Sequence, residues 1–116
     1  MAGTRVLSVP RIGTTRTVHA PSSNTAAVVT LAAVPSYRRI IRTAFWSYNA
    51  APTGGNILIA DATVTQLNLD ITSAGPAMMP IEMTFGANTE VVVTLAAGGS
   101  GVSGKVVIES YLERQD

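Results

Sequence analysis

One stretch of ten residues occurs twice in the chain, and it restricts the fold more than any other feature. Residues 24–33 (NTAAVVTLAA) return 64 residues later as residues 88–97 (NTEVVVTLAA), with eight of ten positions identical. Each copy has a polar start, a β-branched centre and an exit of small residues, which favours a short β-strand. Two copies are too few for a solenoid, which stacks at least three short repeats. The repeat predicts two similar hairpin units that face each other in one domain, and duplication and convergence explain it equally well.

A second apolar run follows each copy, and turn residues separate further β-branched runs about every ten residues. No stretch is a convincing helix. The expected strands are residues 4–9, 14–20, 26–33, 39–48, 56–60, 64–71, 77–85, the second copy of the repeat, and 105–112. Eight or nine short strands of this kind predict an all-β fold, an antiparallel β-sandwich or barrel. Two matching units favour a jelly-roll-like sandwich, because an immunoglobulin-like sandwich would carry a Cys–Trp–Cys pattern.

The clearest alternation of polar and apolar residues lies in the middle of the chain. Residues 56–60 and 64–71 are expected to form a hairpin around a short turn. In its second strand Leu67, Leu69 and Ile71 alternate with polar residues, which predicts one buried side and one solvated side.

Three other positions carry local signals. Strict alternation along residues 39–48 puts Phe45 and Trp46 on opposite faces of a strand. Pro80 predicts an edge strand or a bulge, because proline cannot donate a hydrogen bond to a ladder. Residues 98–104 are glycine-rich and are expected to form the loop of a hairpin.

The N-terminal segment differs in composition from the rest. Residues 1–23 are punctuated by proline and glycine, and Arg5, Arg11 and Arg16 follow one another at intervals of five or six residues without an apolar stripe. This pattern predicts an extended arm, either frayed or pinned across another subunit. The expected organisation is therefore an arm at 1–23 and a single sandwich domain at 24–116.

Charge is sparse and unevenly distributed. Only 13% of residues are charged; residues 1–60 hold six arginines and no acid, whereas residues 61–116 hold seven acids against one lysine and one arginine. Either the two halves neutralise each other within the fold, or the arginines meet acids on a neighbouring protein. Arg38, Arg39 and Arg42 form the densest basic cluster, but nucleic-acid binding would call for more charge and interleaved aromatics. We expect no nucleic-acid partner.

The sequence contains no constellation that predicts an enzyme or a cofactor site. There is no cysteine and only one histidine, His19, so a catalytic triad or a transition-metal site would have to use a residue of the arm. Residues 99–105 match a glycine-rich phosphate loop, but Val106 follows where a helix and a Ser or Thr would be required. No apolar run approaches the 18 residues of a transmembrane helix, so no membrane contact is expected.

Trp46 is the most informative aromatic residue. Together with Tyr37 and Tyr48 it could form a platform for stacking a sugar, or it could anchor a subunit interface. Only six residues of the chain are aromatic, which would furnish a carbohydrate groove thinly. Packing in the core or between subunits is the favoured prediction.

Several turn-and-strand segments resemble small virion proteins of tailed bacteriophages. The segments are residues 36–41 (SYRRII), 47–55 (SYNAAPTGG), 70–76 (DITSAGP), 93–101 (VTLAAGGSG) and 104–105 (GK). The likeness covers roughly residues 24–112, and the chain resembles capsid decoration (cement) proteins of the jelly-roll type. The arginine-bearing arm has no counterpart in it.

The resemblance implies a structural role and no catalysis. It implies a virion protein on the capsid exterior that assembles as dimers or trimers and clamps neighbouring major capsid proteins. The residues that would contact the capsid or a neighbouring subunit are Arg5, Arg11, Arg16, Arg38, Arg39, Arg42 and Trp46. The alternative is a tail or fibre module of β-sandwich fold that binds a host-surface glycan.

Overall fold

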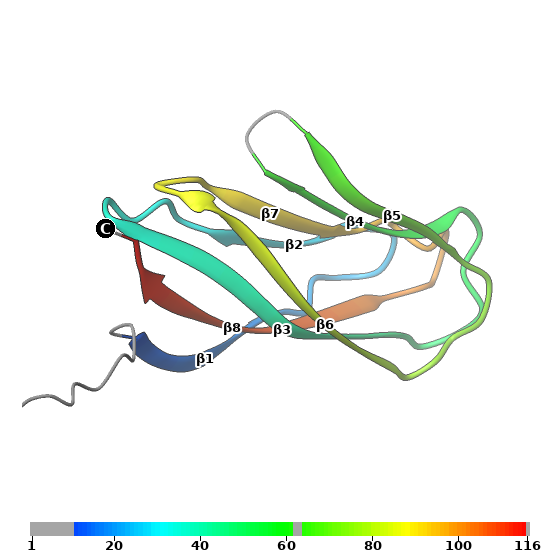
Figure 1. Cartoon of the computed structure of the whole chain (residues 1–116). Helices are drawn as coiled ribbons and strands as arrows, with labels where there is room; N and C mark the ends of the chain where they lie inside the picture. Colours follow the sequence, from blue (N-terminus) through cyan, green and yellow to red (C-terminus); the bar gives the residue numbers. More distant parts are fainter. Residues whose placement is uncertain (1–10, 62–63, 116) are drawn as a thin grey trace, which may run out of the picture.

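The chain folds into eight antiparallel strands that form two packed sheets (Figure 1). The computed structural model describes residues 11–61 and 64–115. The strands are β1 (Arg11–His19), β2 (Ala27–Leu31), β3 (Tyr37–Tyr48), β4 (Gly55–Asp61), β5 (Thr65–Ile71), β6 (Ala77–Ala87), β7 (Val91–Leu95) and β8 (Gly104–Arg114). The first sheet has the order β1-β8-β3-β6 and the second has the order β2-β7-β4-β5. The predicted all-β sandwich is therefore confirmed, and no helix occurs in the described residues.

The strand order is that of a jelly roll. Successive strands cross from one sheet to the other, and only β4 and β5 are consecutive strands that pair within one sheet. Around this hairpin the chain pairs β1 with β8, β2 with β7 and β3 with β6, as one long hairpin rolled upon itself. This pairing corresponds to two Greek-key motifs, which together make the eight-stranded jelly-roll sandwich.

The repeated decapeptides pair with each other in the second sheet. In the β2–β7 ladder Val29 lies opposite Val93, and in the β3–β8 ladder Ala44 lies opposite Ile108. Both pairs are 64 residues apart, which is the spacing of the repeat, so a local two-fold axis relates β2–β3 to β7–β8. The units face each other as predicted, but they are not hairpins, because the two strands of each unit belong to different sheets.

The asparagine that opens each copy has the same backbone conformation. Asn24 has a φ of 53° and Asn88 a φ of 54°, a left-handed region that asparagine tolerates better than most residues. Each backbone N–H donates across to the opposite unit, Asn24 to the Val102 carbonyl and Asn88 to the Tyr37 carbonyl. The polar start of the repeat is therefore a turn that aims the strand into the second sheet.

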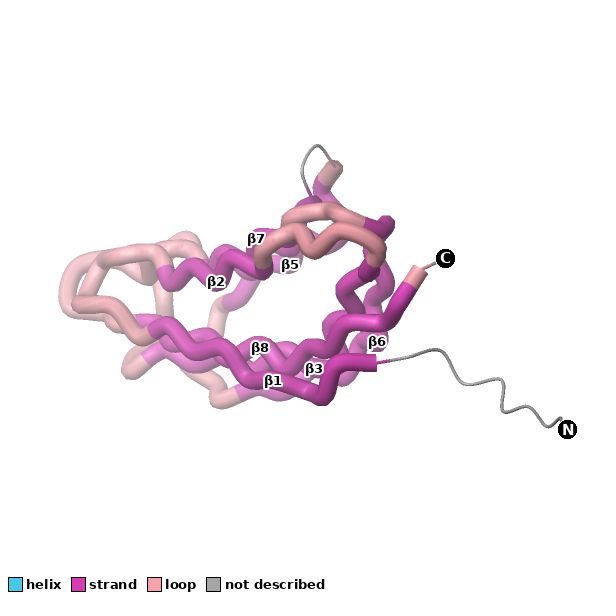
Figure 2. Tube along the Cα trace, turned by 90° about the vertical axis from the view of Figure 1, so that its left-hand side faces the viewer, coloured by secondary structure: helices cyan, strands magenta, loops and turns pink. Residues whose placement is uncertain are grey.

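The two layers of strands face each other (Figure 2). Apolar side chains of both sheets form the core between them. Val29, Val93 and Ile59 of the second sheet and Ile41 and Ile108 of the first are almost fully buried. Burying a side chain of this size contributes roughly 1.5–3 kcal/mol. The alternation predicted for β5 holds in part: Ile71 is buried and Leu67 packs against the core, whereas Leu69 is 42% exposed.

The segment expected to be an arm lies partly inside the sandwich. β1 pairs with β8 along Arg11 to His19, so this part of the expected arm belongs to the first sheet. The strand predicted at 14–20 is confirmed, because the β-branched residues of this segment complete the ladder that β8 would otherwise leave open. Residues 1–10, with Arg5 and the strand expected at 4–9, lie outside the described residues.

Two local predictions fail, one because of a register shift and the other because of the sheet topology. A register shift between Ile41 and Thr43 moves one residue out of the alternation of β3. The same shift lies opposite Pro80 in β6, so the edge strand and bulge predicted from that proline are both confirmed. Residues 98–104 are not a hairpin loop, since they carry the chain from β7 in one sheet to β8 in the other.

Candidate functional site

Three of the predicted interface arginines are paired with acids of the same chain. Arg16 Nε lies 3.0 Å from Glu109 Oε2, and Arg38 Nε lies 2.8 Å from Glu113 Oε1. Arg42 approaches Glu82 at 3.8 Å. Each arginine comes from the basic half and each acid from the acidic half, which supports neutralisation within the fold for these three residues.

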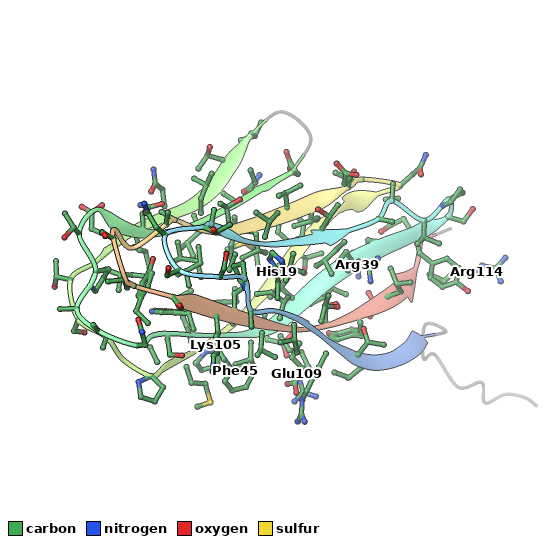
Figure 3. The ribbon with its side chains drawn as sticks, turned by 180° about the vertical axis from the view of Figure 1, so that it is seen from behind. His19, Arg39, Phe45, Lys105, Glu109 and Arg114 are labelled. Atoms are coloured by element: carbon green, nitrogen blue, oxygen red, sulfur yellow. The ribbon has the colours of Figure 1, made fainter. Side chains whose placement is uncertain are left out.

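The Arg39 side chain points between the two layers and is half-buried. Its Nη2 donates to the Ala32 carbonyl at 2.9 Å, while its Nε is buried without a partner among the described residues (Figure 3). Burial lowers the pKa of the Arg39 guanidinium. The Arg11 backbone pairs with Glu113 in the β1–β8 ladder, and Arg5 lies outside the described residues. Of the predicted interface arginines with described side chains, three thus face acids and Arg39 faces a backbone carbonyl.

Trp46 belongs both to the core and to a surface hollow. Its side chain is partly buried and packs against the core cluster. It also lines an open hollow of about 380 Å³ at the β3–β6 border of the first sheet. The walls of this hollow are formed by Phe45, Trp46, Ser47, Pro76, Ala77, Met78, Lys105 and Val107. The lining is mainly apolar, with one cation at the rim.

A row of apolar side chains crosses the outer face of the first sheet, next to this hollow. Val18 lies opposite Val107, Val107 opposite Phe45, and Phe45 opposite Met78, so the row takes one residue from each of the four strands. Val18 is 61% exposed and Met78 is 64% exposed. We call these four residues the apolar row.

The apolar row was not predicted from the sequence. Its residues are spread from position 18 to position 107, and only the register of three ladders brings them together. One local signal was present: Lys105, Val107 and Glu109 alternate along β8, and such residues share one side of a strand. Figure 3 shows Phe45, Lys105 and Glu109 on the same outer side of the sheet.

Four of the five segments that carry the resemblance gather at one end of the sandwich, whereas residues 36–41 lie at the opposite end. Their backbones are joined by hydrogen bonds from Tyr48 to the Ala74 carbonyl, at 2.7 Å, and from Thr53 to the Gly98 carbonyl, at 2.8 Å. The Asn49 backbone N–H donates to the Ser103 carbonyl at 3.0 Å, and the Ser103 backbone N–H donates to Asn49 Oδ1 at 2.8 Å. Three loops far apart in the sequence thus form one bonded end, which we call the loop end.

The only histidine has a structural contact. His19 Nδ1 accepts a hydrogen bond from the Val28 backbone N–H at 2.9 Å and so joins the end of β1 to the free edge of β2 (Figure 3). Within residues 11–61 and 64–115, no three His, Asp or Glu side chains lie close enough to hold a metal ion. No helix that could span a membrane was found in the same part of the chain.

The chain was compared with known protein families and with curated proteins. No protein-family model matches the chain, and no curated protein is significantly similar to it.

Proposed function

We propose that the chain is a virion structural protein that binds the outside of a phage head and stabilises the capsid lattice by clamping neighbouring major capsid proteins. The observation that carries the proposal is the loop end. The turns that resemble tailed-phage virion proteins, around Asn49, Ala74 and Gly98, come from separate parts of the chain and meet in one bonded surface. The jelly-roll strand order also supports it, because this fold is common in viral capsid proteins.

The proposed mechanism is adhesion by many weak contacts. A rigid sandwich presents its loop end and its first sheet, and each copy needs to bind only modestly when many copies engage the same lattice. Arg5 and Arg11 of the N-terminal segment would meet capsid acids, whereas Arg16, Arg38 and Arg42 have acidic partners within the chain. Planar guanidinium groups suit contacts with carboxylates.

Immunogold electron microscopy tests this proposal directly. Antibodies against the purified chain would be applied to particles from a lysate of the cells that encode it. We expect gold on the heads of intact particles, and co-sedimentation of the purified chain with stripped heads. Particles whose heads stay unlabelled would reject the proposal.

A tail or fibre module that binds host glycan is the second candidate. The observation that favours it is the hollow beside Trp46 and Phe45, because aromatic walls stack on sugar rings and jelly rolls also occur in lectins. Gold on tails, together with host-glycan binding that Trp46→Ala abolishes, would support this candidate over the first. A chain that binds no glycan in calorimetry would remove it.

A further inference from the structure

We propose that the outer face of the first sheet is a self-association surface, on which the apolar row of one copy packs against the apolar row of a second copy related by a two-fold axis. This inference extends the proposed function and can fail without it, because it concerns the purified chain with no capsid present.

The apolar row has the position that such an interface requires. It crosses the full width of the sheet, from Val18 on one edge strand to Met78 on the other, with Val107 and Phe45 between them. The two outermost side chains are more than half exposed to solvent. Aromatic residues and methionine are enriched in the centres of protein interfaces. Two sheets packed face to face bury rows of this kind about 10 Å apart.

The charges beside the row select a second copy as the occupant. Along β8, Lys105 and Glu109 lie on the two sides of Val107, and all three share the outer face. A two-fold axis that runs along the row turns the strand direction around. It therefore places Lys105 of one copy over Glu109 of its partner, and Glu109 over the partner's Lys105. Val107 and Phe45 then meet their own equivalents, as an isologous interface demands.

Lys105 and Glu109 can each form a further ion pair with the partner copy. Lys105 is exposed and forms no ion pair with any described residue. Glu109 receives Arg16 at Oε2 only, so Oε1 has no hydrogen bond from the described part of the chain. Arg16 is itself 71% exposed, and its side chain can move aside or remain as a third member of the cluster.

The size of the face fits a reversible dimer. Four strands about 4.8 Å apart, each about ten residues long at 3.3 Å per residue, offer roughly 600 Å². Two such faces would bury roughly 1,200 Å², at the lower limit for specific association. We therefore expect a dimer that forms at high concentration and dissociates on dilution.

Sedimentation velocity of the full chain over a wide concentration range tests the apolar half of the proposal. The wild type is expected to shift from its monomer mass of 12.0 kDa to twice that mass as concentration rises. Phe45→Asp should remain monomeric. Val28→Asp is the matched control, because Val28 is an exposed residue on the outer face of the other sheet, and it should dimerise like the wild type.

Charge exchange tests the orientation of the two copies. Lys105→Glu alone would face Glu109 of its partner, and Glu109→Lys alone would face the partner's Lys105, so each variant should stay monomeric. An equimolar mixture should form a heterodimer, because both cross-contacts become attractive again. Circular dichroism of each variant checks that the sheet is intact.

Three results would overturn the proposal. The first is a wild type that is monomeric at millimolar concentration. The second is a dimer that survives Phe45→Asp, or that Val28→Asp disrupts equally. The third is a mixture of the two charge variants that remains monomeric. A monomeric wild type that binds phage heads through Phe45 would assign this face to the capsid and reject self-association, while leaving the proposed function in place.

Discussion

The two copies of the repeat end in equivalent ways, yet their exits are satisfied by different side chains. The carbonyl of Ala96 accepts a hydrogen bond from the Tyr48 hydroxyl at 2.7 Å, and the carbonyl of Ala32, 64 residues earlier, accepts one from Arg39 at 2.9 Å. At the loop end the donor is a buried aromatic residue, and at the opposite end it is a half-buried cation. Leu112 takes the place that Tyr48 has in the other unit.

This difference shows that symmetry of the backbone does not impose symmetry of the packing. Gly98 and Gly104 leave room for the Tyr48 ring, because a Cβ on either would lie within 3.1 Å of it. The shorter loop at the opposite end has no glycine, and its chain turns by a hydrogen bond from the Tyr37 N–H to the Val34 carbonyl. We conclude that the loop end is the more tightly specified end of the sandwich.

The largest difference in stability between the two ends is expected when Tyr48 and its equivalent Leu112 are each replaced by alanine. Tyr48→Ala deletes a ring that is 4% exposed, together with its hydrogen bond, and should lower the free energy of unfolding by about 3–5 kcal/mol. Leu112→Ala, at a position 9% exposed beside the edge strand, should cost about 2 kcal/mol. Urea unfolding measures both values. Equal losses would contradict the contrast between the ends.

Adding a methyl group tests the same contrast from the opposite direction. A Cβ at Gly104 would lie 2.9 Å from Leu95 Cδ2 and 3.1 Å from Tyr48 Cε1, so Gly104→Ala should cost about 1–3 kcal/mol. Gly86 is the matched control near the opposite end, because the nearest atom to its Cβ would be Thr89 Oγ1 at an ordinary 3.5 Å. Gly86→Ala should change thermal stability by less than about 1 kcal/mol. A loss as large as that of Gly104→Ala would refute the argument from packing.

The Tyr48 hydroxyl should make the stability of the protein depend on pH in the alkaline range. Burial raises the pKa of Tyr48 above its ordinary value. An unfolded tyrosine ionises near pH 10. The folded state then holds a proton that the unfolded state has released, so stability falls as pH rises from about 10 through the raised pKa.

Tyr48→Phe separates this effect from general alkaline unfolding. At neutral pH the variant should lose about 1–2 kcal/mol, because the Ala96 carbonyl loses its donor. Above pH 10 the difference from the wild type should shrink, since phenylalanine does not ionise. Unfolding curves at several pH values measure the difference, and a constant gap up to pH 11 would show that the hydroxyl is not held neutral by the fold.

The sequence predicted the architecture well because its signals were local. The repeated decapeptide, the alternation in β5 and Pro80 each act within a few residues, and they gave the strand content, the hairpin and the edge correctly. β1 lies before the boundary expected at residue 23; it has few apolar residues and is held by its ladder with β8. Composition alone does not distinguish such a strand from an arm.

The candidate surfaces were much less predictable. The arginines were chosen from charge, but their acidic partners lie 75 and 93 residues away for Arg38 and Arg16, and no local pattern links them. The apolar row depends on three ladder registers and on the shift near Thr43, which reverses the alternation of β3. A register is set by the whole sheet, so its consequences could not be derived one segment at a time.

The smallest effect is expected at the exit of the first copy. Arg39→Met removes the donor to the Ala32 carbonyl, but it also removes a half-buried charge whose Nε has no partner among the described residues. The two contributions oppose each other, because a hydrogen bond contributes about 1 kcal/mol and an unsatisfied buried donor costs a similar amount. The loss should stay below about 1 kcal/mol in urea unfolding, and below that of Tyr48→Phe. Arg39→Lys is the control, since it keeps the charge and shortens the reach to the carbonyl, and it should be no more stable than Arg39→Met. If Arg39→Met cost as much as Tyr48→Phe, the two exits would be energetically equivalent, and the loop end would have no special claim to rigidity.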